Sequence, residues 1–156
     1  MNTKRRTFLK GAGAAGTVAV AVAAGLLKPT EVLAAEWNKA AFDAKGMPDA
    51  LKVLNAAGAA DSKDITIKAP DIAENGAVVP VEVTSKIAGT SSIALMVEKN
   101  ANPLTANFDL ANGADGYVST RIKMGQTSNV RVLVKAGGKT FTAVKEVKVT
   151  IGGCGG

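Results

Sequence analysis

Short apolar segments with a period of two residues fill the chain from Ile65 almost to its C-terminus. In most of them every second residue is aliphatic. The segments are Ile65–Lys68, Val79–Val83, Ile93–Glu98, Ala106–Leu110, Val118–Ile122, Val130–Val134 and Thr140–Ile151. Such alternation places one face of a strand toward a core and the other toward solvent. About seven short strands without helices between them predict a mainly β protein, an immunoglobulin-like antiparallel β-sandwich.

The connections between these segments carry further information. Gly137-Gly138 predicts a tight hairpin turn before the last strand. Pro80 has no N–H group to donate, so it is expected on an edge strand or near the start of its strand. Residues 71–76 are rich in turn-forming residues and are interpreted as a connection. Antibody domains carry a cysteine–tryptophan–cysteine signature that this chain lacks, so the pattern predicts an architecture and not an ancestry.

The first 34 residues have the composition of an export signal. A charged segment containing Arg5 and Arg6 precedes a glycine- and alanine-rich run, and Ala34 and Ala35 provide a small-residue cleavage site. The charged segment is similar to the twin-arginine motif, with Lys4 where serine or threonine is more usual. The run is too short and too mildly apolar for a membrane span. We therefore predict cleavage after Ala34 and export to the periplasm, with no membrane attachment afterwards; an uncleaved signal anchor is the alternative.

The chain is thus expected to have three parts: a signal peptide at 1–34, a sandwich domain at 35–151, and a tail at 152–156. Two short helices are expected before the first strand. One ends near Gly46, and the other begins at Pro48 and stops at Gly58. Trp37 and Phe42 are expected to pack as part of this helical lid.

Removing the leader changes the charge of the protein. The chain has 19 basic and 13 acidic residues, a net charge of +6. The leader holds five of the former and one of the latter, so the mature chain has 14 and 12, a net charge of +2. Nucleic-acid binding needs a clustered basic patch, usually with stacking aromatics, and aromatic residues make up only 4% of the chain. We therefore expect no nucleic-acid partner.

The chain has no histidine and a single cysteine, so we expect no metal site and no cofactor of its own. An internal disulfide is impossible as well, although the periplasm would permit one. Twin-arginine export generally serves proteins that fold before they cross the membrane. A partner that folds with this chain in the cytoplasm explains that route better than a cofactor does.

The one cysteine, Cys154, lies in a tail of glycines, with Gly152 and Gly153 before it and Gly155 and Gly156 after it. Glycine has the greatest backbone freedom of any residue, so this composition predicts a flexible tether that exposes the thiol. Small residues on both sides would let the tail pass into a narrow channel of another protein. The tail follows a strand expected to be well anchored in the sheet, with Val147, Val149 and Ile151 on one face and Lys148 and Thr150 on the other.

A catalytic cysteine needs a neighbouring base to form the thiolate, and this chain offers no histidine. A mobile tail also cannot hold an oxyanion hole in place. We therefore predict no enzyme, and interpret Cys154 as a covalent attachment point on which other active sites act. The alternatives are a thiol-dependent sulfurtransferase, a structural sandwich that dimerises through a Cys154 disulfide, and a terminus with an incidental cysteine.

The tail resembles the swinging arm of the SoxY family, the carrier subunits of the bacterial Sox system for thiosulfate oxidation. The similarity extends through much of the mature chain, in the stretches Asp71–Val81, Val97–Asn100, Thr120–Met124 and Glu146–Thr150. The tail is the specific part of this resemblance, because the four stretches alone would be ordinary sheet segments. Lys4 is the one departure, and it affects targeting only.

The resemblance implies a periplasmic heterodimer with SoxZ, an immunoglobulin-like subunit without its own leader. It implies that the cytochrome enzyme SoxAX joins thiosulfate to Cys154, that the dimanganese hydrolase SoxB releases sulfate, and that the molybdenum–haem dehydrogenase SoxCD can oxidise the remaining sulfur. Every intermediate, including a persulfide, would stay on Cys154.

Overall fold

The computed structural model describes residues 38–111 and 113–152. Two helices precede nine strands in this part of the chain: α2 (Lys39–Asp43), α3 (Met47–Val53), β1 (Ala60–Asp61), β2 (Ile65–Lys68), β3 (Ile72–Asn75), β4 (Val79–Ser85), β5 (Thr90–Val97), β6 (Leu104–Asp109), β7 (Tyr117–Ile122), β8 (Ser128–Ala136) and β9 (Lys139–Ile151). Neither α2 nor α3 has the length and hydropathy needed to cross a bilayer, and no further helix in these residues does.

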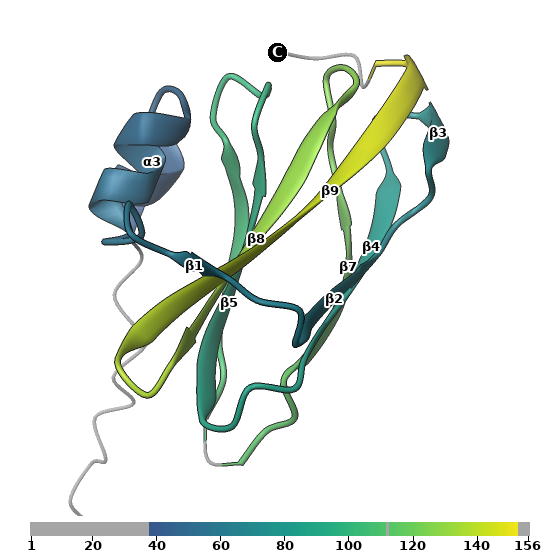
Figure 1. The fold of residues 1–156 in the computed structure, drawn as a ribbon. Coiled ribbons are helices and arrows are strands. Elements are labelled where there is room, and N and C mark those ends of the chain that lie inside the picture. The colour runs from purple at the N-terminus through teal and green to yellow at the C-terminus, as the bar shows by residue number, and fades with distance from the viewer. Residues whose placement is uncertain (1–37, 112, 153–156) are drawn as a thin grey trace, which may run out of the picture. The chain divides into compact units, whose positions relative to one another are not determined.

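The strands form two sheets (Figure 1). The larger sheet has the order β1-β9-β8-β5-β6, with β3 also paired to β9, and the smaller has the order β2-β4-β7. The predicted sandwich is confirmed. Its pairing differs from the prediction at β9, where β1 and β3 both run parallel to it, β1 along the first half and β3 along the second.

Strand β3 occupies a segment that the sequence predicted to be a connection. Only Ala73 of its four residues is buried, so the segment has no apolar alternation to detect. It is a strand because β9 continues beyond Val147 and offers free backbone groups, with Ile72 opposite Lys148 and Asn75 opposite Ile151. Satisfying those groups outweighs the weak intrinsic preference of the segment.

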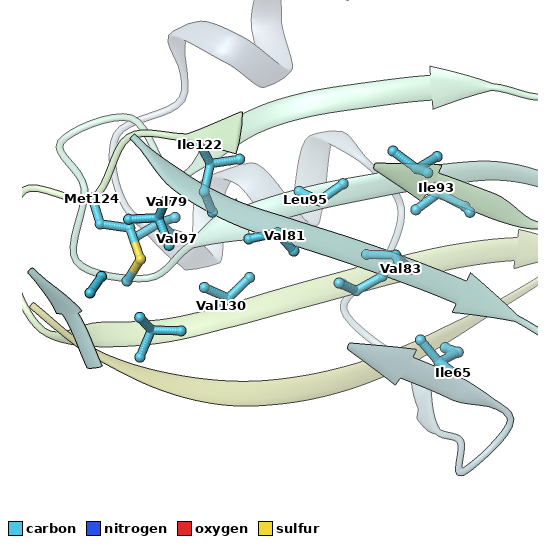
Figure 2. Packing of buried hydrophobic residues seen from close by; sticks show 14 of the residues in the cluster. Ile65, Val79, Val81, Val83, Ile93, Leu95, Val97, Ile122, Met124 and Val130 are labelled. Atoms are coloured by element: carbon cyan, nitrogen blue, oxygen red, sulfur yellow. The ribbon is translucent and has the colours of Figure 1, made fainter. Parts of the chain in front are cut away.

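The main core lies between the two sheets and consists of the inward residues of the alternating segments (Figure 2). Its fully buried members are Val79, Val81, Val83, Ile93, Leu95, Val97, Met124, Val130, Val132, Val134 and Val147. All of these except Met124 belong to strands that the period-two pattern predicted. Met124 lies in the loop after β7, and its side chain closes one end of the core beside Val79 and Val97 (Figure 2).

A second core lies on the outer face of the larger sheet, where the helices cover it. Ala41 and Ala50 from the helices are completely buried, as is Met96 of β5. The small side chains let the helices lie close to the sheet, while β5 is buried on both faces. Phe42 packs against this cluster, as predicted for a helical lid; Trp37 lies outside the described residues.

The predicted helix boundaries are partly wrong. Gly46 lies at the N-cap of α3 with a φ of 86° rather than ending the first helix, which stops at Asp43. Helix α3 ends at Val53, well before Gly58, and Asn55 takes a left-handed conformation with a φ of 53°. Asparagine tolerates this conformation better than most residues, so it ends the helix without a glycine.

The predictions for Gly137-Gly138 and for Pro80 agree with the structure. Gly137 and Gly138 have φ values of 54° and 74°, which is the geometry of a two-residue hairpin turn between β8 and β9. Pro80 is the second residue of β4, as one of its two predicted positions required. Although β4 is the central strand of its sheet, β2 pairs only with the part of β4 that begins at Glu82, so Pro80 has a neighbouring strand on one side only.

Candidate functional site

The structure places the base of the predicted arm but not its cysteine. Gly152 is the last described residue, so Cys154, Gly153, Gly155 and Gly156 lie outside the described part of the chain. The predicted export motif at Arg5 and Arg6 and the cleavage site at Ala34 and Ala35 lie outside it too. The candidate site is therefore the arm root, which we define as Gly152 with the residues that hold it: Gly76, Asn100, 123–125 and Ile151.

Strand β9 reaches the arm root through backbone pairing with β3. The N–H of Gly76 donates to the carbonyl oxygen of Ile151 at 2.8 Å, directly beyond the last ladder pair. One residue earlier, the Thr150 hydroxyl donates to the carbonyl of Glu74 at 3.0 Å. On the other side, the N–H of Val149 donates to the hydroxyl of Thr127 at 2.9 Å. The strand is thus held by β3 up to its last residue, and by Thr127 on the other side as far as Val149.

The loop after β7 is the second component of the arm root. Met124 inserts its side chain into the core with none of its surface exposed, and its N–H donates to the carbonyl of Gly76 at 2.7 Å. Gly76 therefore bonds both to this loop and to Ile151. Because an apolar plug and a backbone hydrogen bond act on the same residue, Met124 cannot shift without breaking one of them.

Asn100 bridges the residues on either side of Met124. Its side-chain amide donates to the carbonyl of Lys123 at 2.8 Å, and its side-chain oxygen accepts the N–H of Gly125 at 3.1 Å. The amide thereby satisfies two backbone groups of an exposed turn that no strand pairs. An asparagine suits this position because its side chain carries both a donor and an acceptor.

The segment that carries Asn100 is itself fixed to β8. Glu98 accepts hydrogen bonds from Arg131 at 2.8 Å and from the side chain of Asn129 at 3.0 Å. The N–H of Lys99 donates to the hydroxyl of Ser128 at 3.0 Å, and Ser128 is buried. The Glu98–Arg131 pair is about one quarter exposed, so solvent screens it less than a surface pair.

Gly152 lies directly against this loop. A Cβ atom added to Gly152 would fall well under 3.0 Å from the carbonyl oxygen of Gly125 and 3.2 Å from its carbonyl carbon. Real Cβ atoms essentially never approach that closely, so only glycine fits here. The first glycine of the predicted flexible tail is thus required for a close backbone approach.

Large apolar side chains are exposed around the arm root. Ile151 is 67% exposed and Val78, which follows Gly76 by two residues, is 54% exposed. The sequence placed Ile151 on the same strand face as Val147 and Val149, and of these Val147 is fully buried. The position of Ile151 in the alternation is the inner one, but it lies past the end of the core that Met124 closes.

The described residues of the arm root include no histidine that could act as a base toward a thiol. The chain has no histidine, and the described residues contain no cluster of acidic or cysteine side chains that could hold a metal. Lys145 is bound elsewhere, to the carboxylate of Asp71 at 3.0 Å and the carbonyl of Ala69 at 2.7 Å. A cavity of about 350 Å³ lies at the opposite end of the sandwich, lined by residues 87, 89–91, 110 and 113–116.

The four stretches that carried the sequence resemblance meet at the arm root. Gly76, Asn100 and Met124 come from the first three, and the fourth is the part of β9 that pairs with β3. The sequence indicated these stretches only as sheet segments. Asn100 was missed as a site residue; its one available signal was an asparagine at a break in the strand pattern, which is usually only a turn.

All four stretches lie within the part of the chain that matches a known protein family. The family model described as "Sulfur oxidation protein SoxY" matches residues 51–154, a span that includes Cys154. The solved structure of the sulfur carrier protein SoxY from Chlorobium limicola f thiosulfatophilum is 44% identical, with a TM-score of 0.60, over 67% of this chain and 96% of that one.

An engineered protein of known structure matches at 14% identity and a TM-score of 0.39, over 56% of this chain and 20% of that one. That likeness is too low to carry an argument. No match was found among curated proteins. The family match over most of the chain, and the identity to a solved relative that this chain covers almost completely, show that the chain belongs to the SoxY family.

Proposed function

We propose that this protein is a periplasmic sulfur carrier that holds thiosulfate-derived intermediates covalently on Cys154 and presents them to separate oxidising enzymes. The observation that carries the proposal is the SoxY family match, which extends to Cys154, since the solved relative is a sulfur carrier protein. The arm root supports it, because a strand bound on both sides ends directly before the glycine tail.

The chemistry of such a carrier follows from the thiol. Oxidative conjugation removes two electrons and one proton as Cys154 and thiosulfate form a disulfide-type bond, giving a cysteine S-thiosulfonate. Hydrolysis then adds water, releases sulfate and leaves a persulfide on Cys154. Oxidation of that persulfide by six electrons, with three water molecules as the oxygen source, gives a second sulfonate that hydrolysis can release. The electron acceptors and the metals belong to partner enzymes.

The partners we propose are those of the Sox system. SoxZ would form the heterodimer, and SoxAX, SoxB and SoxCD would bind transiently to act on the arm. Export by the twin-arginine pathway, directed by Arg5 and Arg6 and followed by cleavage between Ala34 and Ala35, would deliver the folded pair to the periplasm. A disulfide between two Cys154 thiols is a further state that a single cysteine can reach.

Intact-mass spectrometry tests this function. Protein from cells grown on thiosulfate is expected to carry adducts on the C-terminal peptide that a reductant removes, and Cys154→Ser protein from the same cells is expected to carry none. Growth on thiosulfate should be lost with Cys154→Ser. Unmodified wild-type protein in growing cells would contradict the proposal, and turnover by the purified protein alone would show a sulfurtransferase instead.

A further inference from the structure

We infer that Gly152 is the fixed anchor of the arm and not its hinge, and that Asn100 is a positioning residue that sets where and in which direction the arm leaves the fold. The anchoring is independent of the biochemical role of the protein. Its consequence for sulfur transfer rests on the function proposed above.

Gly152 lies in close contact with Gly125. The space at Gly152 is limited by the backbone carbonyl of Gly125 and not by the end of a side chain. A side chain can rotate away from an added methyl group, whereas a backbone carbonyl moves only if its loop moves. The Ile151 carbonyl, which belongs to the same peptide unit as the Gly152 N–H, accepts a hydrogen bond from Gly76. The space beside Gly152 then depends on whether the 123–125 loop can retreat.

The 123–125 loop is held at each of its three residues. Asn100 binds the carbonyl of Lys123 and the N–H of Gly125, while Met124 is buried and bonded to Gly76. The loop therefore cannot move by a local rotation of one residue. Moving it would expose Met124 or leave backbone groups without partners, and both changes are unfavourable.

Asn100, which holds the 123–125 loop, is itself held in place by β8. Asn100 follows Glu98 and Lys99, which are bonded to Arg131, Asn129 and Ser128 of β8. Gly76 connects the loop to β9, since it forms hydrogen bonds with Met124 of the loop and with Ile151 of β9. The position of Gly152 is thus determined by segments far apart in the sequence that meet at one end of the sandwich.

The consequence is a shorter free tether than the sequence alone suggests. With Gly152 fixed, the Cα of Cys154 lies within about 7 Å of it, two extended residues, compared with about 10 Å if three residues were free. One residue fewer also has to be ordered when the arm is held in an active site. That ordering corresponds to roughly a tenfold difference in the population of the bound arm.

Relaxation measurements on ¹⁵N-labelled full-length mature protein test the inference. In the wild type the amide of Gly152 is expected to have an order parameter of about 0.8, as in a rigid backbone, and the glycines after it values below about 0.6. Asn100→Ala and Gly152→Ala should both lower the order parameter at position 152.

Asn102→Ala is the matched control for the first variant, because Asn102 bonds to the carbonyl of Phe42 and to Lys45 at the helices. Gly58→Ala is the control for the second, because no atom lies within 4 Å of its added Cβ.

Function provides the second readout. Adduct formation on Cys154 with thiosulfate and the conjugating cytochrome enzyme should slow about tenfold in Asn100→Ala, while alkylation of Cys154 by iodoacetamide keeps its wild-type rate. A small reagent needs no positioned arm, so the ratio of the two rates separates positioning from general destabilisation.

Two results would overturn the inference: an amide of Gly152 as mobile as that of Gly155 in the wild type, or equal order parameters at Gly152 in Asn100→Ala and Asn102→Ala. If thiosulfate never loads the wild type, the proposed function fails, and the relaxation data still decide whether Gly152 is an anchor.

Discussion

Replacing Met124 with alanine measures how much of the stability of the sandwich depends on the end that carries the arm. Its side chain is fully buried and closes the core beside Val79 and Val97 (Figure 2). Loss of a buried methionine side chain costs about 2–5 kcal/mol. Taking about 3 kcal/mol and roughly 4 °C per kcal/mol for a domain of this size, we expect Tm to fall by ~12 °C.

Met96→Ala is the matched control for Met124→Ala. Met96 is equally buried, but it belongs to the cluster between the helices and the larger sheet. Urea and thermal unfolding followed by circular dichroism should show comparable losses in both variants. Only Met124→Ala should also lower the order parameter of Gly152. A loss below about 1 kcal/mol for Met124→Ala would refute the reasoning, because this end of the sandwich would then not be packed as core. Equal loosening of Gly152 in both variants would show that any destabilisation releases the arm.

Two further experiments test the far end of the sandwich and the segment that holds the arm root. Gly116→Ala would place a Cβ 2.6 Å from the carbonyl oxygen of Ser85, so we expect a loss of about 1–3 kcal/mol in urea unfolding; a neutral result would show that β4 and β7 can separate there. A double-mutant cycle with Glu98→Gln and Arg131→Met should give a coupling energy of about 1 kcal/mol that decreases in high salt. A coupling energy of zero would mean that this ion pair does not hold the segment that carries Asn100.

The sandwich could be predicted from the sequence because each inward face repeats with a period of two. Val130, Val132 and Val134 of β8, for example, are all fully buried. Gly137 and Gly138 could be predicted as a turn for an equally local reason, since two adjacent positive φ values favour glycine. These features depend on residues that are close in sequence, and the pattern therefore contains them.

The arm root could not be predicted because its contacts are not local. Strand β3 forms only because β9 continues past the core, and nothing in its own four residues requires an extended conformation. In the sequence, Gly152 appeared to be one of four equivalent flexible glycines. In the structure it must lack a side chain because the carbonyl of Gly125, 27 positions earlier, lies directly against it. A glycine needed for close approach and a glycine needed for freedom look the same in a sequence.

The distinction between these two kinds of glycine bears on how a carrier with one thiol can serve several enzymes. Ordering a backbone residue costs about 1–2 kcal/mol, and each enzyme that receives the arm must supply that free energy again for every free residue. The fold supplies it once for Gly152, through Met124, Asn100 and Gly76. A fixed root also limits the directions from which Cys154 can be reached. Under the proposed carrier function, each partner enzyme would have to approach this end of the sandwich, past the exposed side chains of Val78 and Ile151, so we expect the enzymes to compete with one another for the arm.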